Sequence, residues 1–579
     1  MNNEIDEKVE IENPFPGLRP FDVEESHLFF GREHQIQELL RKLSLYHFVS
    51  VVGTSGSGKS SLVRAGLLSK LYSGYNTENG SDWTIAIMRP GANPVLNLSN
   101  VLFDKEIFGT GGDDKKNTSD AYKVLNESAL GLIQIIRARI KRGSNFLLLV
   151  DQFEELFRFA GAESDDDAKL QADHFVKLLI EAVKQQDAGI YVVITLRADF
   201  LGDCSTFEGL PEAINNGQYL IPRLNREHYK AAIEGPVNYA NGKIAPRLVQ
   251  QLLNDMSNNQ DQLPILQHAL MRSWEDWKKS PDIGEPMDLD NYKTVGGMEK
   301  ALNLHANEAY EELDDKKKKL AELIFKCVTV KGLDNRGIRR PTKLKDISAI
   351  TKASQNDIIS VLNVFRKSGR GFIMPPEGIQ ILPETIVDIS HESLMRNWER
   401  LKDWVDDEYD SAQMYIRISE SAQLFENKVA GLWRDPELSV ALEWREKNNP
   451  HKAWAMQYND DFGKSMKFLD ASIVEKDKMN AEKKLRRLIT NVIVVIFLLC
   501  AGGLTLWATI ERGTASKSAK EALKEKANAE KQEKFALEKE SEAEKNFQTE
   551  ELQRKKAEEQ TLEADKQRQE AIKQKGIVY

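Results

Sequence analysis

Strand-length apolar runs alternate with amphipathic stretches of helical length between Pro14 and about Leu224. The runs are FVSVVG, WTIAIM, NFLLLVD and IYVVITLR. Nearly every position in them is apolar, which is typical of strands that are covered on both faces. Alternation of such strands with helices predicts a parallel sheet with helices on both faces. We therefore expect an α/β core over residues 13–224, preceded by a flexible leader, 1–12.

The pattern changes after this core. Residues 225–310 have apolar positions at helical spacing, as in LVQQLLNDM and PILQHALMRSWEDW, and are predicted to be helical. Over 311–400, helices give way to the short runs RGFIMPP and IQILPETIVDIS, which fits a winged-helix domain. Residues 401–487 are predicted to be a further helical region, rich in Trp and charge.

One long segment contains no charged residue and is mostly apolar. Leu488 to Ile510 comprises 23 residues without a charge, and as a helix it would be roughly 35 Å long, enough to cross a bilayer. Burial in a protein core is disfavoured because charged sequence flanks the segment on both sides. We expect one transmembrane helix at 488–510. The basic run at 483–487 suggests that the N-terminal region is cytoplasmic, although lysines also follow the segment.

The tail, residues 511–579, holds 16 Lys/Arg and 16 Asp/Glu. Opposite charges at i,i+3 and i,i+4 favour a helix. Its apolar residues are sparse, so a long solvated helix is favoured over a weak coiled coil.

Composition narrows the function classes. A chain of 579 residues exceeds one hydrophobic core, so several domains are expected. A net charge of −10 disfavours nucleic acid as the main partner. The three cysteines, Cys204, Cys327 and Cys500, lack the spacing of a zinc site or a disulfide framework.

A phosphate-binding motif follows the first apolar run. VVGTSGSGKSSL matches G-x-x-x-x-G-K-[ST], and it stands between a predicted strand and a predicted helix. Glycines let successive backbone N–H groups point at phosphate oxygens, and the helix N-terminus adds positive potential. We expect Lys59 to reach the β- and γ-phosphates and Ser60 to bind Mg²⁺. The predicted nucleotide-binding residues are Gly53, Thr54, Ser55, Gly56, Ser57, Gly58, Lys59, Ser60 and Ser61.

The run NFLLLVDQFEELF supplies a second magnesium ligand. Asp151 ends a buried strand, where its carboxylate would hold Mg²⁺ through water. Gln152 follows it, in place of the Glu that commonly polarises water in fast ATPases. Glu154 and Glu155 come next, and either is a candidate for that role. A solvated helix start is the alternative for both glutamates.

Arg197 ends the strand IYVVITLR, at the edge of the sheet where ligands of α/β proteins bind. It would contact the γ-phosphate and report its presence. The alternative is a salt bridge to Asp199 or Asp203.

These motifs, together with NPFPGLRPFDVEESHLFFGRE, LPILQHALMRSWE, YKTVGGMEKALNLHANEAY and VDISHESLMRNWERLKDW, resemble the novel STAND NTPases from Asn13 to Trp404. That family implies an α/β P-loop NTPase core, a helical lid at 225–310 and a winged helix, closed over bound nucleotide. By this resemblance, Gly31 and Arg32 lie near the adenine and Pro264 packs near the base. His391 would lie against the phosphate of ADP.

The resemblance implies a membrane-anchored switch that binds ATP or ADP with Mg²⁺. ADP would hold it closed, and ATP would open it for self-oligomerisation, with slow hydrolysis. The stimulus and any protein partner are not predicted. One alternative is a DNA-binding ATPase that uses the basic runs at 336–345 and 366–371. Another is an ATP-binding scaffold without useful turnover.

His391 has three interpretations. It could contact bound nucleotide or the core, pack structurally, or perform acid–base chemistry. Ser390 is expected to cap a helix that starts at His391. The apolar face of that helix comprises Leu394, Trp398, Leu401 and Trp404.

Overall fold

The computed structural model describes residues 12–77, 80–109, 114–141, 143–160, 166–258, 263–279, 284–332, 337–511, 523–542 and 544–545. The chain divides into two compact units, Met1–Asp470 and Ala471–Tyr579. The predicted leader lies almost wholly outside the described residues, and so does the end of the tail.

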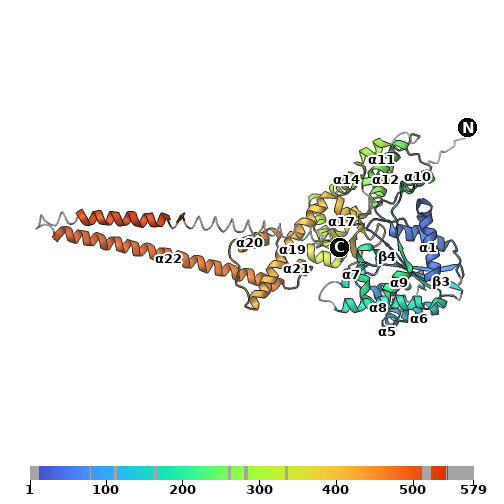
Figure 1. The fold of residues 1–579 in the computed structure, drawn as a ribbon, viewed down its shortest axis with the longest axis horizontal. Helices are drawn as coiled ribbons and strands as arrows, with labels where there is room; N and C mark the ends of the chain where they lie inside the picture. The colour runs from blue at the N-terminus through green and yellow to red at the C-terminus, as the bar shows by residue number, and fades with distance from the viewer. Residues whose placement is uncertain are drawn as a thin grey trace, which may run out of the picture. The chain divides into compact units, whose positions relative to one another are not determined.

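A five-stranded parallel sheet forms the centre of the first unit (Figure 1). Its strands are β1 (Phe48–Gly53), β2 (Asp82–Met88), β3 (Ser144–Val150), β4 (Ile190–Arg197) and β5 (Gln218–Leu220), in the order β2-β3-β4-β1-β5. The first four coincide with the apolar runs that predicted them. β5 is only three residues long, too short to leave a clear run.

Helices cover both faces of this sheet, because alternate strand residues point to opposite sides. Tyr191 and Val193 pack in one apolar cluster, whereas Val192 and Ile194 pack in the other. The first cluster is covered by α1 (Glu33–Tyr46), the π-helical η2 (Leu62–Leu68) and α3 (Ser69–Tyr72), and the short α2 (Lys59–Ser61) precedes η2. The second is covered by α4 (Pro94–Leu102), α5 (Asp114–Glu127), α6 (Gly131–Arg139), α8 (Asp166–Lys184) and α9 (Leu210–Gly217).

The predicted helical region 225–310 is helical throughout its described part, apart from the connections. It contains α10 (Arg226–Tyr239), α11 (Pro246–Asn258), α12 (Leu263–Lys278), α13 (Leu289–Thr294) and α14 (Gly297–Glu311). Its apolar core continues into the residues that follow, since Leu302 and Leu362 belong to one buried cluster. The boundary at 310/311 stays a prediction.

Residues 311–400, hereafter the 311–400 module, combine helices with short strands. The helices are α15 (Asp315–Cys327), α16 (Leu344–Thr351) and α17 (Gln355–Arg366). The strands are β6 (Thr329–Lys331), β7 (Gly337–Arg339), β8 (Thr342–Lys343), β9 (Ile373–Met374) and β10 (Ile386–Ile389). They form an antiparallel sheet in the order β8-β10-β9 and a separate β6–β7 pair. This content agrees with the sequence pattern, and the winged-helix assignment stays a prediction.

The single helix expected after Ser390 is wrong. A short helix, α18 (Ser393–Asn397), ends before Trp398, whose extended backbone separates it from α19 (Glu399–Glu426). Trp398 is fully buried and donates from its indole to Asn307 Oδ1 at 2.9 Å, which fixes the break. Ser390 does not cap α18, because its hydroxyl has no hydrogen-bond partner among the described residues and Glu392 occupies the N-cap position. The predicted apolar face is nevertheless buried, from Leu394 to Trp404.

The region after α19 contains α20 (Glu437–Asn448), α21 (Lys452–Ala455) and the start of α22 (Phe462–Glu511). In the second unit, α22 carries the apolar segment. Within the described residues this helix is long and apolar enough to cross a membrane, with a mean hydropathy of 2.4 and none of that window buried in protein. It is therefore a candidate membrane span. Residues 523–542 are also helical.

Candidate functional site

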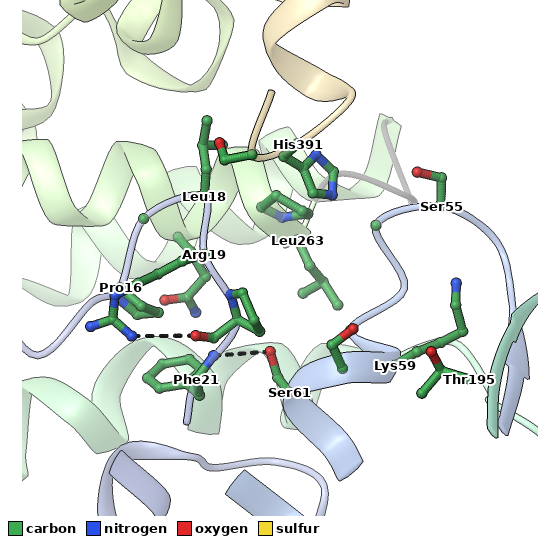
Figure 2. A pocket seen from close by; sticks show the side chains of 18 of the residues that line it. Pro16, Leu18, Arg19, Phe21, Ser55, Lys59, Ser61, Thr195, Leu263 and His391 are labelled. Carbon is green, nitrogen blue, oxygen red and sulfur yellow. Dashed lines mark hydrogen bonds between the residues drawn. The ribbon is translucent and has the colours of Figure 1, made fainter. Parts of the chain in front are cut away.

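A cavity of about 170 Å³ opens at the carboxyl ends of β1, β3 and β4. Its lining includes residues 16–21, the phosphate-binding loop, the first turns of α12, and residues 390–392 of the 311–400 module. Figure 2 shows Lys59 and Thr195 on one side, Pro16 and Phe21 on another, and His391 above them. The phosphate-binding loop, Glu154, Arg197, Pro264 and His391 therefore contribute to one cavity, whereas Asp151 is not among its lining residues.

The loop from Gly53 to Ser60 has the backbone of a phosphate cradle. Gly56 and Gly58 adopt φ values of 79° and 87°, which L-residues with a side chain rarely occupy. Lys59 Nζ donates to the carbonyl oxygens of Gly53 at 2.9 Å and Thr54 at 2.7 Å. Burial lowers the pKa of Lys59, partly opposed by Glu154. An anion beside this ammonium would compensate for its burial.

The predicted magnesium ligands lie together. Ser60 Oγ donates to Asp151 Oδ1 at 2.8 Å, and Thr195 Oγ1 donates to the same oxygen at 2.7 Å. Arg64 pairs with the other oxygen of Asp151 at 3.3 Å. Burial alone would raise the pKa of Asp151, but Arg64 and nearby Arg89 hold it below its usual value. Asp151 is therefore held as a carboxylate beside the Ser60 hydroxyl.

The structure separates the two candidate glutamates. Glu154 lines the cavity and accepts from the Arg197 main-chain N–H at 3.3 Å. Glu155 is not among the lining residues; its carboxylate accepts from the Gly91 N–H at 3.0 Å, and burial raises its pKa. Of the two, only Glu154 faces the space where a nucleotide would bind.

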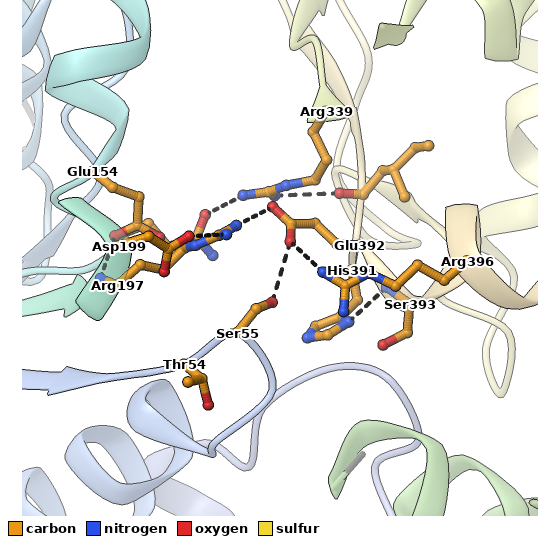
Figure 3. A network of polar contacts seen from close by, with 12 residues as sticks. Thr54, Ser55, Glu154, Arg197, Asp199, Arg339, His391, Glu392, Ser393 and Arg396 are labelled. Carbon is orange, nitrogen blue, oxygen red and sulfur yellow. Dashed lines mark hydrogen bonds and ion pairs between the residues drawn. The ribbon is translucent and has the colours of Figure 1, made fainter. Parts of the chain in front are cut away.

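Arg197 bonds to groups on both sides of the cavity (Figure 3). It forms a salt bridge with Asp199, as the alternative interpretation expected. Its Nη1 also donates to Glu392 Oε1 of the 311–400 module at 2.6 Å, and the two side chains are only 14% and 9% exposed. Burial works to lower the pKa of Arg197, but Glu392 and Asp199 raise it above its ordinary value. No contact with Asp203 is seen among the described residues.

Glu392 also reaches the phosphate-binding loop. Its Oε2 accepts from Ser55 Oγ at 3.2 Å. One carboxylate of the 311–400 module thus binds both the loop and Arg197, two groups expected to bind phosphate. Sequence reasoning did not single out Glu392, although it stands beside His391.

His391 lines the cavity with a defined orientation. The Ser393 main-chain N–H donates to its Nδ1 at 3.1 Å. Burial lowers the pKa of His391 to about 4, so the ring is neutral at pH 7. Because Nδ1 accepts, the proton resides on Nε2, which makes that atom a hydrogen-bond donor.

The remainder of the cavity wall is mostly apolar and suits a nucleobase. It comprises Leu18, Pro20, Phe21, Leu28, Phe29, Phe30, Leu224, Ala232, Leu263 and Pro264. Arg32 lines this part, but its guanidinium donates to the carbonyl oxygens of Pro222 at 2.7 Å and Ser57 at 3.2 Å. Gly31 does not line the cavity. Its φ is 84°, and a Cβ there would lie 2.5 Å from the His228 carbonyl oxygen, so glycine is required by packing.

These features fit a nucleoside triphosphate with Mg²⁺. The glycine loop and Lys59 suit phosphates, and the Ser60–Asp151 pair supplies the oxygen ligands that Mg²⁺ prefers. The apolar wall suits a planar base.

The basic runs considered for DNA binding are largely committed to other contacts. Arg339 is buried against Asp388, and Arg340 donates to the main-chain oxygens of residues 326 and 327. Lys343 and Lys345 both pair with Glu384. Among the described residues of the first run, four basic side chains are thus engaged in contacts within the protein.

Comparison with solved structures found distant similarities. The Walker-type ATPase of Pyrococcus abyssi is 14% identical, with 66% of this chain and 99% of that chain covered and a TM-score of 0.33. The ORC2 protein of Aeropyrum pernix, in ADPNP and ADP complexes, is 11% identical, with coverages of 65% and 94% and a TM-score of 0.35. The RuvB Holliday junction branch migration motor of Thermotoga maritima is 16% identical, with coverages of 66% and 98% and a TM-score of 0.28.

The comparison with curated protein sequences found no match. The family model described as Novel STAND NTPase 1 matches residues 14–430. That range covers the sheet, the phosphate-binding loop, α12 and the 311–400 module with its Glu392 and His391. The chain belongs to the Novel STAND NTPase 1 family.

Proposed function

We propose that this protein is a membrane-anchored nucleotide switch that ADP holds closed and ATP opens. In the closed form, the 311–400 module covers the phosphate end of the cavity. In the open form, the module leaves the core and exposes surfaces through which the chain self-associates.

The observation that carries this proposal is the set of contacts made by Glu392. Its carboxylate bonds Arg197 at 2.6 Å and Ser55 at 3.2 Å, from a position 195 and 337 residues away in sequence. A γ-phosphate bound by the loop and by Arg197 would compete for the same donors. Because two anions repel each other at such range, ATP and the Glu392 contacts disfavour one another.

ADP lacks the γ-phosphate that competes with Glu392, and it could accept a hydrogen bond from His391 of the 311–400 module. The neutral ring of His391 lines the cavity, and its Nε2 proton would be donated to a β-phosphate oxygen there. ADP therefore favours the closed form and ATP the open form. Nucleotide biases the equilibrium only through this difference in affinity.

Hydrolysis would return the switch to its ADP-bound form. The Glu154 carboxylate would accept a proton from water, and Lys59 and Arg197 would be the cations around the transferred phosphoryl group. Ser60 and Asp151 would hold Mg²⁺, which would neutralise the charge that develops on the phosphates. The apolar part of α22 would anchor the chain in a bilayer with the first unit in the cytoplasm.

The test compares the detergent-purified chain with its Lys59→Ala variant, using Lys70→Ala, an exposed lysine on α3, as the matched control. Nucleotide content is measured after denaturation, and mass is measured by light scattering with ADP or a non-hydrolysable ATP analogue. We expect nucleotide in the wild type and control but not in Lys59→Ala, and a larger mass only with the ATP analogue. Equal nucleotide content and equal mass in all three proteins would contradict the proposal.

A further inference from the structure

A second contact of the 311–400 module reaches the magnesium side of the cavity. Arg339, the last residue of β7, donates from Nη2 to Gln152 Oε1 at 2.6 Å. The two residues are 187 positions apart in sequence, and both line the cavity. Gln152 directly follows Asp151, the expected magnesium ligand.

Arg339 does not need Gln152 for charge balance. Its Nη1 donates to Asp388 Oδ2 at 2.9 Å, and both side chains are 7% exposed. Burial works to lower the pKa of Arg339, but Asp388 and the acids around it raise it. The Arg339–Asp388 pair lies within the module, so it would accompany the module when it moves. The bond to Gln152 would then break.

Gln152 is connected to the magnesium ligands through its main chain. Its N–H donates to Thr195 Oγ1 at 2.8 Å, and Thr195 Oγ1 donates to Asp151 Oδ1 at 2.7 Å. Ser60 Oγ donates to the same Asp151 oxygen at 2.8 Å. The backbone of Gln152 is therefore fixed relative to the metal site, whereas its side chain is held by the module.

The backbone conformation of Gln152 decides where that side chain lies. Its φ is 60°, in the left-handed region that costs a residue with a side chain about 1 kcal/mol. The conformation turns the chain sharply after β3. As a result the Gln152 side chain lines the cavity beside the phosphate-binding residues.

We propose that Gln152 orients the attacking water and that Arg339 is a positioning residue that withholds it in the closed form. This inference rests on the proposed switch. A carboxamide both donates and accepts hydrogen bonds, so it can fix the position of a water molecule without taking its proton. In the closed form, the Gln152 oxygen is occupied by Arg339. Opening frees it.

The reaction is then divided between two side chains. The water oxygen forms a bond to the γ-phosphorus as the bond from phosphorus to the β,γ-bridging oxygen breaks, and ADP leaves with that electron pair. Glu154 accepts the water proton and returns it to the released phosphate. Gln152 holds the water in line throughout. Hydrolysis thus becomes dependent on the position of the 311–400 module.

The test is a double-mutant cycle on the full chain in detergent, with kcat and KM measured for ATP. Gln152→Ala should lower kcat by at least about tenfold, because positioning is lost, while KM stays within about twofold. Arg339→Lys keeps a cation for Asp388 but lacks the second arm of the guanidinium, so it should raise kcat severalfold. In the Gln152→Ala background, Arg339→Lys should have no effect on kcat. Gln251→Ala, at an exposed glutamine on α11, is the matched control.

Three results would overturn the inference. The first is an unchanged kcat in Gln152→Ala. The second is a rise in kcat from Arg339→Lys that is equally large with and without Gln152. The third is an absence of hydrolysis in both wild type and Arg339→Lys although both bind ATP. Binding of a fluorescent ATP analogue to the same preparations separates this failure from that of the switch. If Lys59→Ala binds the analogue as wild type does, the proposed nucleotide site itself is wrong.

Discussion

Removing the Glu392 carboxylate should open the closed form. The perturbation is Glu392→Ala, which deletes the bonds to Arg197 at 2.6 Å and from Ser55 at 3.2 Å. A hydrogen bond to a charged group contributes about 1.5–3 kcal/mol to stability. We take about 2 kcal/mol for the Arg197 bond, because Asp199 still pairs with Arg197 and no uncompensated charge is left buried. The longer bond from Ser55 adds about 0.5 kcal/mol.

A loss of about 2.5 kcal/mol changes the ratio of closed to open protein by about 70-fold. Since ADP leaves from the open form, its release should accelerate by up to that factor. The assay loads a fluorescent ADP analogue and follows its release by stopped flow. Glu392→Gln, which keeps a neutral acceptor, should give an intermediate rate. Glu384→Gln alters an exposed pair elsewhere in the module and should match wild type.

The reasoning would be refuted if Glu392→Ala released ADP within about twofold of the wild-type rate. The Glu392–Arg197 contact would then form in the closed form without stabilising it.

Other expectations concern stability and membrane association. Gly31→Ala should lower the Tm by several degrees in a thermal melt, because its Cβ would lie 2.5 Å from the His228 carbonyl oxygen; an unchanged Tm would contradict this packing argument. Burial lowers the pKa of His268 to about 3 and that of His305 to about 2, so only the unfolded chain binds these protons between about pH 6.5 and 3. The free energy of unfolding should therefore fall with acidification, by up to about 1.4 kcal/mol per pH unit per histidine, and denaturant titrations at pH 7, 6 and 5 on wild type and His268→Gln should show a shallower fall in the variant. The full chain should sediment with membranes and resist carbonate extraction. The substitution Val495→Lys, at an exposed position on α22, should weaken this membrane retention. Equal extraction of the wild type and the variant would argue against a membrane-spanning helix.

Much of the core follows directly from local pattern. Residues such as Val192 and Val193 are buried on opposite faces of the sheet, so their strands form continuous apolar runs that a sequence shows clearly. The phosphate-binding loop is equally local, because the glycines, Lys59 and Ser60 act within a few positions of one another. Ser60, after the loop that follows β1, and Asp151, directly after β3, were both expected at the carboxyl edge of the parallel sheet.

Contacts between distant segments could not be predicted in the same way. Glu392 and Arg339 look in sequence like ordinary charges in a solvated module, and Arg339 belongs to one of the basic runs considered for the DNA-binding alternative. Their roles depend on how the 311–400 module packs against the core, which no local pattern encodes. The break between α18 and α19 at Trp398 also depends on packing between residues far apart in the sequence. Burial of its indole against Asn307 outweighs the helical propensity of the surrounding residues.

The roles of Glu154 and Glu155 also could not be distinguished from the sequence. Glu154 directly precedes α7 (Glu155–Ala160), Glu155 begins it, and both are buried, so spacing alone does not distinguish them. The two side chains differ because the Gly91 N–H donates to the Glu155 carboxylate, which therefore has a structural role.

The most direct test of the account is a distance between core and module as nucleotide changes. Spin labels at Arg41, on α1, and at Glu384, in the module, would be introduced into a Cys500→Ser chain, in which Cys204 and Cys327 are buried. With ADP, the account predicts one narrow distance distribution in pulsed electron resonance. With a non-hydrolysable ATP analogue it predicts a longer and broader one, and Glu392→Ala should show it even with ADP. The same narrow distribution under all three conditions would contradict the claim that nucleotide controls this contact.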